Sequence, residues 1–334
     1  MKNKGSLIGV IVIVLVAIGA GAIWKLRPAP EQARNSLTIG IATWVGFGSG
    51  IVGMEKGFFP EMDVQTKTLD DARARQAAFV SGDLDIMISS VDLFAQEAGK
   101  GIQGKVFLIT DESHGGDGIV AKAEIKTIAD LRGKKVAYTH GGPSDYLLFK
   151  ALERAGVKRN EVKLVAVDDP SRAGETFLSG DVDAAVTWEP FLTNTAESGK
   201  GHILATTKDY PEIIVDILVA SDKLAADEKL LRQFMEGWLK SVDYIKKHPD
   251  EAAAIMAKGL NLPVDDVKGM MAGLRFADHE RNRYFFDKAG PAGSRVARLF
   301  DEAGKYWKSI DVVEQPVKGP SRVSETACSY FNPG

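Results

Sequence analysis

Cysteine is nearly absent from this chain, which has one thiol, Cys328, among 334 residues. A single thiol excludes an intrachain disulfide and a zinc site built from thiolates. A basic excess is absent too, since 42 Lys and Arg stand against 45 Asp and Glu for a net charge of -3. Nucleic-acid-binding proteins usually carry a basic stripe or surplus, so we expect no nucleic-acid partner.

Recognisable catalytic and cofactor motifs are missing as well. The chain has no nucleophile elbow, no dinucleotide-binding glycine fingerprint and no HExxH spacing among its five histidines. The loop His140–Ser144 is not a P-loop, because no Lys follows at the required spacing. We therefore expect a protein that is not an enzyme, with no catalytic residues, no metal site and no cofactor.

One long apolar run is present, at the N-terminus. Leu7–Trp24 has no charged or polar side chain and is flanked by basic residues on both sides. Its length suits a membrane span, whereas Ala20–Ala22 would suit the cleavage site of a secretory signal. We expect residues 1–28 to be a signal peptide or an inner-membrane anchor, and the rest of the chain to be periplasmic.

A repeat with a spacing of 98 residues organises the remaining chain. Phe79–Ser90 (FVSGDLDIMISS) returns without a gap as Phe177–Pro190 (FLSGDVDAAVTWEP). Each copy is predicted to end a helix at a Gly, where a left-handed cap needs no Cβ, and then to form a short apolar strand. The Asp pairs Asp83/Asp85 and Asp181/Asp183 are predicted to hold the turn and not a metal.

Strands and helices alternate as far as Ala220, which predicts parallel sheets, and helices follow. The segment Asp111–Gly118 is predicted to be a loop, and Gln315–Gly334 an extended surface tail. We expect an α/β fold of two lobes joined by two hinge crossovers, with a ligand cleft between them. Residues 29–115 and 216–334 would form lobe one, including the C-terminal helices and tail, and residues 116–215 would form lobe two.

Candidate ligand contacts lie at strand ends and helix starts. Aromatic rings can enclose the apolar body of a ligand, and free backbone N–H groups at a helix start can bind an anion. The candidates are Trp44, Ser89, Ser90, Gly141, Gly142, Ser144, Trp188 and Glu189. Three further acids are expected at the hinges or mouth of the cleft: Asp111, Asp117 and Asp216. A core role for either tryptophan, and a purely structural role for the His140–Ser144 loop, are the alternatives.

Taken together, these motifs resemble the nitrate/sulfonate/taurine-type periplasmic solute-binding proteins of bacterial ABC importers, which also include binders of the thiamin pyrimidine precursor. The segments that carry the resemblance are the Trp44 loop, Gly57–Phe59, Phe79–Asp85, Asp111–Ala121, Ala129–Ala137 and Phe177–Leu192. The resemblance implies a monomer whose two lobes close over a small-molecule solute, and an ABC permease in the inner membrane as its partner. A related pyrimidine-precursor enzyme uses a cysteine-rich motif, which this chain lacks.

The ligand class stays open at the level of sequence. The candidate loops carry no Arg for a sulfonate or nitrate, and Arg172, at a helix start, is the nearest. The acids and tryptophans favour a ligand with an amino or heteroaromatic part. Helix-start amides alone can nevertheless bind an oxyanion.

Overall fold

The computed structural model describes residues 35–288 and 290–333. The predicted signal peptide or anchor at residues 1–28 lies outside the described residues. Among the residues that are described, no helix is long and apolar enough to cross a membrane.

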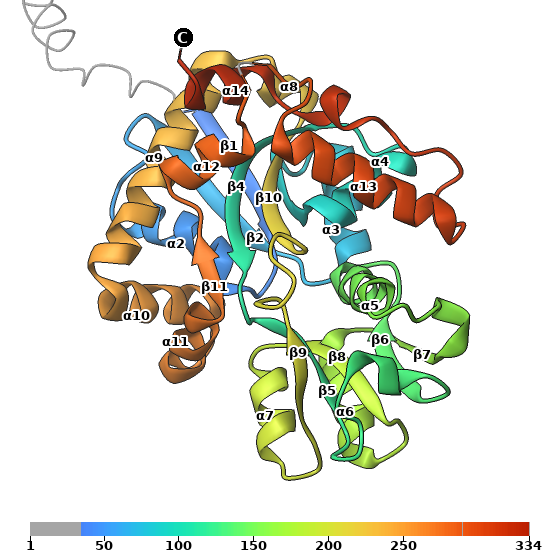
Figure 1. The fold of residues 1–334 in the computed structure, drawn as a ribbon. Coiled ribbons are helices and arrows are strands. Elements are labelled where there is room, and N and C mark those ends of the chain that lie inside the picture. The colour runs from blue at the N-terminus through green and yellow to red at the C-terminus, as the bar shows by residue number, and fades with distance from the viewer. Residues whose placement is uncertain (1–34, 289, 334) are drawn as a thin grey trace, which may run out of the picture. The chain divides into compact units, whose positions relative to one another are not determined.

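Two separate β-sheets form the framework of the described chain (Figure 1). The first has the strand order β11-β4-β10-β3-β1-β2 and the second has the order β7-β6-β8-β5-β9. The strands of the first sheet are β1 (Asn35–Ile41), β2 (Met62–Thr68), β3 (Ile86–Ser90), β4 (Lys105–Ser113), β10 (Val215–Ala220) and β11 (Leu274–Phe276). Those of the second are β5 (Asp117–Ala121), β6 (Lys135–Thr139), β7 (Lys163–Val167), β8 (Ala184–Trp188) and β9 (His202–Thr206). The expected α/β class is therefore confirmed.

Both sheets are mixed, so the prediction of parallel sheets was wrong in part. The repeated units are parallel, with β1 beside β3 and β6 beside β8. The strands next to the chain crossings run the other way: β10 is antiparallel to β3 and β4, and β5 is antiparallel to β8 and β9. The chain leaves the first sheet after Ser113 and returns to it at Val215. The lobe boundaries at residues 115/116 and 215/216 stay predictions.

The polar segment Asp111–Gly118 is not a loop throughout, which corrects a second prediction. Asp111 and Glu112 continue β4 and pair with Asp216 and Val215 of β10, while Asp117 already belongs to β5. Pairing with a neighbouring strand on each side satisfies the backbone there, so long-range contacts override the loop-like composition. As a result, acidic side chains enter the interior of the fold.

The 98-residue repeat is a structural repeat. Asp71 and Asp169 accept hydrogen bonds from backbone N–H groups at the starts of their helices, and Gly82 and Gly180 end those helices at φ +85° and +90°. The apolar runs Leu84–Ile88 and Val182–Val186 were predicted to be the repeated strands, which begin two residues later, at Ile86 and Ala184.

Asp85 and Asp183 occupy equivalent structural positions in the two copies. The carboxylate of Asp85 accepts a hydrogen bond from the Thr38 N–H at 3.0 Å, and that of Asp183 accepts one from the Lys135 N–H at 2.9 Å. The first bond ties the turn to the middle of the neighbouring parallel strand β1, and the second ties it to the first residue of β6. The structural interpretation of these acids is confirmed.

We expect Asp183→Ala to lower the free energy of unfolding by about 1–2 kcal/mol, because a backbone N–H and Lys122 lose their acceptor. The matched variant is Asp181→Ala, whose carboxylate is exposed and accepts from Ser179. It should cost under ~0.5 kcal/mol. Urea denaturation measures both, and equal losses would contradict the assigned role.

The helices cover the sheets and complete the core. They are α2 (Gly48–Glu55), α3 (Ala72–Ser81), α4 (Val91–Gly99), α5 (Pro143–Arg154), α6 (Pro170–Ser179), α7 (Phe191–Glu197), α8 (Asp222–Ala225), α9 (Glu228–Lys247), α10 (Pro249–Leu260), α11 (Val264–Ala272), α12 (His279–Phe285), α13 (Arg295–Ser309) and α14 (Glu325–Phe331). Figure 1 shows α13 lying along α4, the helix that follows β3. This placement brings the C-terminal helices close to the candidate site.

The predicted extended tail is wrong. The segment holds a 3-10 turn, Gly319–Arg322, and helix α14, whose Ala327, Cys328 and Phe331 are fully buried. These three apolar side chains recur at helical spacing, so the helix gains burial that the prolines alone did not suggest. Burial also raises the pKa of the Cys328 thiol to about 11, which makes it a core residue and not a reactive one.

Candidate functional site

Two predicted aromatic contacts, one from each sheet, meet in the structure. Trp44 follows β1 and begins the short 3-10 helix Val45–Phe47, and Trp188 is the last residue of β8. Their ring centroids are 6.2 Å apart and the ring planes are inclined by 31°. The structure therefore brings together side chains that lie 144 positions apart in sequence.

Trp44 is held in place by the acidic end of β4. Its indole N–H donates to Asp111 Oδ1 at 3.3 Å, and a Cβ atom at position 46 would lie 1.9 Å from Asp111 Oδ2. Gly116 also lies close to the indole, since a Cβ there would be 3.0 Å from the Trp44 ring and 2.8 Å from the Gly273 carbonyl oxygen. Glycine is thus required at both positions for the indole to reach its present place.

We expect Gly46→Ala to destabilise the protein by about 1–3 kcal/mol, because the added methyl must displace the Asp111 carboxyl and break its bond to Trp44. Gly269→Ala is the control, since a Cβ there meets no atom within 4 Å on helix α11. The control should be neutral or stabilising by helix propensity. Thermal unfolding of the two variants checks this, and an unchanged Tm for Gly46→Ala would contradict it.

The three acids predicted for the hinges or mouth lie buried beside this tryptophan pair. Asp216 stands opposite both Ser90 and Asp111 on neighbouring antiparallel strands, and Asp117 stands opposite Trp188. Opposite residues of a ladder point to the same face of the sheet. Asp111, Asp117 and Asp216 are at most 8% exposed. A hinge or mouth role for them stays a prediction.

Burial changes the acidity of these side chains. It raises the pKa of Asp117 to about 7, helped by the negative charges of Asp111 and Glu189. It also raises the pKa of Asp111 and, together with the charge of Asp111, that of Asp216. The Asp111 and Asp216 carboxyls hydrogen bond to each other, which requires a proton between them.

A fourth buried acid, Asp92, was missed by the sequence analysis. It lies in the first turn of α4, two residues after Ser90, which caps that helix. Asp92 is 2% exposed, and neither carboxylate oxygen has a hydrogen-bond partner among the described residues. Burial raises its pKa to about 7, although Ser90 and the N–H groups of the helix start act in the opposite direction. A position just after a repeated strand was the only signal in the sequence.

The predicted anion loop lies opposite the same helix. Gly142 is the N-cap residue of α5, so no side chain caps the N–H groups of this helix start. Ser144 is 3% exposed, and its hydroxyl forms no hydrogen bond with the described residues. Gln96 of α4 donates to the Gly141 carbonyl oxygen at 2.5 Å. Because Asp92 and Gln96 are four residues apart on α4, both face the start of α5. The face of α4 that carries Asp92 and Gln96 therefore lies opposite the start of α5.

A network around Asp145 fixes the anion loop. This fully buried carboxylate accepts hydrogen bonds from Arg159 at 2.5 Å, Tyr306 of α13 at 2.6 Å and the Gly141 N–H at 3.1 Å, and it contacts His140 at 2.8 Å. Asp145 thus has a full set of partners, unlike Asp92. Nothing in the local sequence indicated that α13 would supply the tyrosine.

Two predicted contacts, Ser89 and Glu189, already have internal partners. The Ser89 hydroxyl donates to Oε2 of Glu97, on α4, at 3.0 Å. Because successive side chains of a strand point to opposite faces of the sheet, Ser89 and Ser90 lie on different faces of β3. The Glu189 carboxylate accepts from the N–H and hydroxyl of Thr193, at 3.1 and 2.7 Å, at the start of α7. Ligand roles for both residues stay predictions, and these internal hydrogen bonds leave their side chains fewer free donors and acceptors for a ligand.

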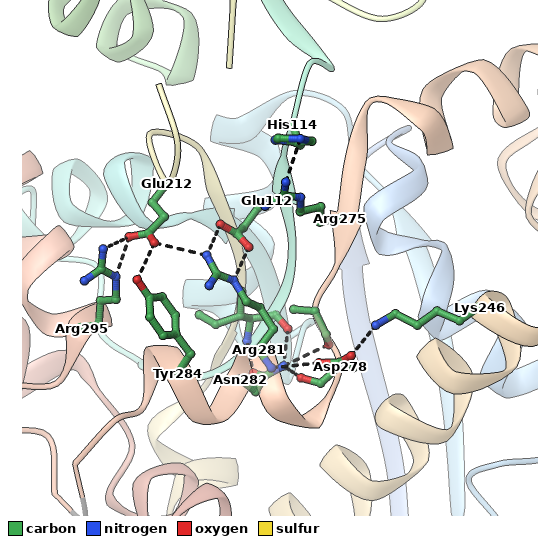
Figure 2. A network of polar contacts seen from close by, with 12 residues as sticks. Glu112, His114, Glu212, Lys246, Arg275, Asp278, Arg281, Asn282, Tyr284 and Arg295 are labelled. Atoms are coloured by element: carbon green, nitrogen blue, oxygen red, sulfur yellow. Dashed lines mark hydrogen bonds and ion pairs between the residues drawn. The ribbon is translucent and has the colours of Figure 1, made fainter. Parts of the chain in front are cut away.

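Arginine side chains neutralise the acids of the two chain crossings (Figure 2). Arg281 of α12 pairs with Glu112 of β4 and with Glu212, which precedes β10. Glu212 also pairs with Arg295 of α13 and accepts from Tyr284 at 2.8 Å. By contrast, no ion pair joins Asp92, Asp111, Asp117 or Asp216 to a basic side chain among the described residues. The negative charge of these four acids is therefore not balanced by an ion pair within the described residues.

A cavity of about 440 Å³ lies elsewhere, between α5, the segment before β10, and α13. Its charged lining includes Lys150, Glu153, Glu212 and Arg295, in which Lys150 pairs with Glu153 and Glu212 with Arg295. None of the predicted ligand contacts lines it. We place the candidate site at the tryptophan pair, where buried polar groups lack partners.

Comparison with known proteins shows which folds and sequences this chain resembles. The periplasmic aliphatic sulphonate-binding protein of Escherichia coli superposes with a TM-score of 0.72 at 18% identity, covering 90% of this chain and 100% of that one. The alkanesulfonate-binding protein of Xanthomonas axonopodis pv. citri, bound to MOPS, gives 0.64 at 18% identity over 90% and 99%. The taurine-binding periplasmic protein of Escherichia coli is 24% identical over 260 residues, 72% of this chain and 78% of that protein.

The two sheets and these structural neighbours define the two-lobed periplasmic-binding-protein fold, which confirms the expected fold for the described residues. Residues 45–252, more than half of the sequence, match the family described as NMT1/THI5 like. The chain belongs to that family, and the resemblance drawn from its motifs is confirmed.

Proposed function

We propose that this protein is the extracytoplasmic solute-binding component of an ABC-type importer. The observation that carries the proposal is the meeting of Trp44 and Trp188 from two separate sheets, beside polar groups that lack partners. The relatives named for taurine and aliphatic sulphonate binding support it. Export to the periplasm and delivery of the solute to an inner-membrane permease follow from that role.

Capture would proceed by closure of the two sheets around the solute. The groups from the first sheet and its helices are Trp44, Ser90 and Asp92, and those from the second are Gly141, Gly142, Ser144 and Trp188. A ligand that binds the closed arrangement better shifts the population toward it, and a permease can distinguish the closed form. The Asp92 face of α4 and the start of α5 are the surfaces that such closure would bring onto the solute.

An oxyanion such as a sulfonate fits the start of α5. Free N–H groups and the helix dipole favour negative charge there, and Ser144 adds a hydroxyl. A thiamin pyrimidine precursor is the second candidate ligand, because its aminopyrimidine ring suits the tryptophan pair and the buried acids.

A thermal-shift screen tests the proposal. The panel should contain taurine, alkanesulfonates and nitrate on one side, and amines and aminopyrimidines on the other. A solute at 100 times its Kd stabilises the folded protein by about 2.7 kcal/mol, so a true ligand should raise Tm by several degrees. A panel without a single reproducible shift would overturn the proposal.

A further inference from the structure

We propose that the site takes a solute bearing an ammonium group, and that Asp92 is its principal partner. The inference rests on the proposed function and adds the chemical class of the solute. The carboxylate of Asp92 is buried to 2% exposure, and among the described residues it has no basic side chain beside it and no hydrogen bond of normal geometry to either oxygen. The Ser90 hydroxyl and the N–H groups of the helix start only partly offset the effect of burial on its pKa.

A buried carboxylate without a partner is costly, since each lost hydrogen bond to a charged group and the missing counter-charge both oppose folding. Such groups persist in proteins where they serve binding or catalysis. Asp92 faces the start of α5, as Gln96 one turn later contacts Gly141. Its negative charge also acts on Asp117, Asp216 and Tyr146, so these groups surround the same space.

The second observation is the contrast with neighbouring acids. Glu112 adjoins Asp111 in β4 and is paired with Arg281, whereas the partners of Asp111 among the described residues are Trp44, Thr110 and Asp216. Arginines therefore form ion pairs with the acids at the crossings. Within the described chain, the acids at the tryptophan pair form no ion pair, and the charge of Arg75 acts on Asp216 alone among them. A cationic group on the solute would balance the charge that the described residues leave unbalanced.

The geometry also accounts for both ends of a zwitterionic solute. The start of α5 offers N–H groups to an anion, while Asp92 at the start of α4 offers a carboxylate to a cation. The two indoles would enclose the carbon chain between these ends or, for a protonated heterocycle, its ring. A small sulfonate without nitrogen would use only the first of these two contacts.

Matched pairs of solutes that differ only at the nitrogen test the inference. One pair is taurine and isethionate, in which a hydroxyl replaces the amine. The other is 4-amino-5-aminomethyl-2-methylpyrimidine and its 5-hydroxymethyl analogue. Kd values at pH 8 are measured by calorimetry for the parent protein, Asp92→Asn and the control Asp243→Asn, an exposed acid on α9.

In the pair that binds, we expect the amine to bind at least tenfold more tightly than the hydroxyl analogue. Asp92→Asn should remove that preference, and Asp243→Asn should keep it. The preference in the parent protein does not depend on the variant, so a folding defect would not hide the answer.

The outcomes separate the inference from the proposed function. If a hydroxyl analogue binds as tightly as its amine, or Asp92→Asn keeps the preference, the inference is wrong while the proposed function stands. Binding of the pyrimidine pair would identify the cation as an aminomethyl group on a heterocycle. Binding of the taurine pair would identify it as the amino group of an aminoalkane. If none of the four solutes binds, the inference is overturned, and the wider thermal-shift panel decides the proposed function separately.

Discussion

Replacing Asp92 with Asn is expected to stabilise the ligand-free protein at pH 8. Burial raises the pKa of Asp92 from 3.8 to about 7, so at pH 8 the folded protein holds a buried charge that the unfolded chain hydrates freely. A shift of this size corresponds to ~4 kcal/mol, at 1.36 kcal/mol per pKa unit. Asparagine keeps the shape of the side chain and removes the charge.

The stabilising effect of Asp92→Asn is expected to depend on pH. Because the folded pKa lies above the unfolded one, the folded protein binds more protons between pH 4 and pH 7, and its stability falls as pH rises through that window. Below about pH 4 the acid is protonated in both states and contributes nothing. The advantage of Asp92→Asn should therefore grow by about 3–4 kcal/mol from pH 4 to pH 8.

Urea denaturation of the parent protein, Asp92→Asn and Asp243→Asn at pH 4, 6 and 8 measures this. The exposed Asp243 control should follow the parent at every pH. A loss of stability in Asp92→Asn at pH 8 would show that the carboxylate has an internal partner, contrary to the structure. A gain would mean that the chain keeps Asp92 at a cost to its own stability.

Removing the Trp188 ring is expected to weaken binding of the solute found by screening by ten- to a hundred-fold. Loss of apolar contact on one side of the ligand corresponds to about 1–3 kcal/mol. Trp188 is the better test than Trp44, because it is less buried and lacks the bond to Asp111 that anchors the Trp44 indole. A change at Trp188 therefore reports binding more than folding.

Calorimetry on Trp188→Ala, Trp188→Phe and Ser144→Ala measures this expectation. Trp188→Phe retains an aromatic ring and should lose much less affinity than the alanine variant. Binding of the solute to Trp188→Ala and Ser144→Ala as tightly as to the parent protein would show that the site lies elsewhere.

Local patterns were enough to predict the repeated units. Glycine at helix ends and Asp at turns act through contacts within a few residues, so Gly82, Gly180, Asp71 and Asp169 behave as expected. Trp44 and Trp188 each lie at the carboxyl end of a strand, where ligand sites form in open α/β sheets, so both could be named as candidates from the sequence. Their contact joins two separate sheets, and no local pattern predicted it. In the repeated units, the residues that form the local sequence pattern are the same residues that form the caps and turns of the structure.

Features set by distant partners could not be predicted. Asp111 reads as a loop residue until β10 and β11 pair beside β4. Asp92 looks like an ordinary acid in the first turn of a helix, and only the surrounding elements make it buried and unpartnered. Asp145 depends on Tyr306, 161 positions away. When a remote segment buries a residue, the sequence around that residue carries no pattern that predicts the burial.

The decisive measurement is a crystal structure of the protein with the solute identified by screening. We expect ligand density against the Trp44 and Trp188 rings, with a cationic nitrogen about 3 Å from an Asp92 oxygen. Density in the cavity lined by Lys150, Arg295 and Arg298, with neither indole in contact, would contradict it.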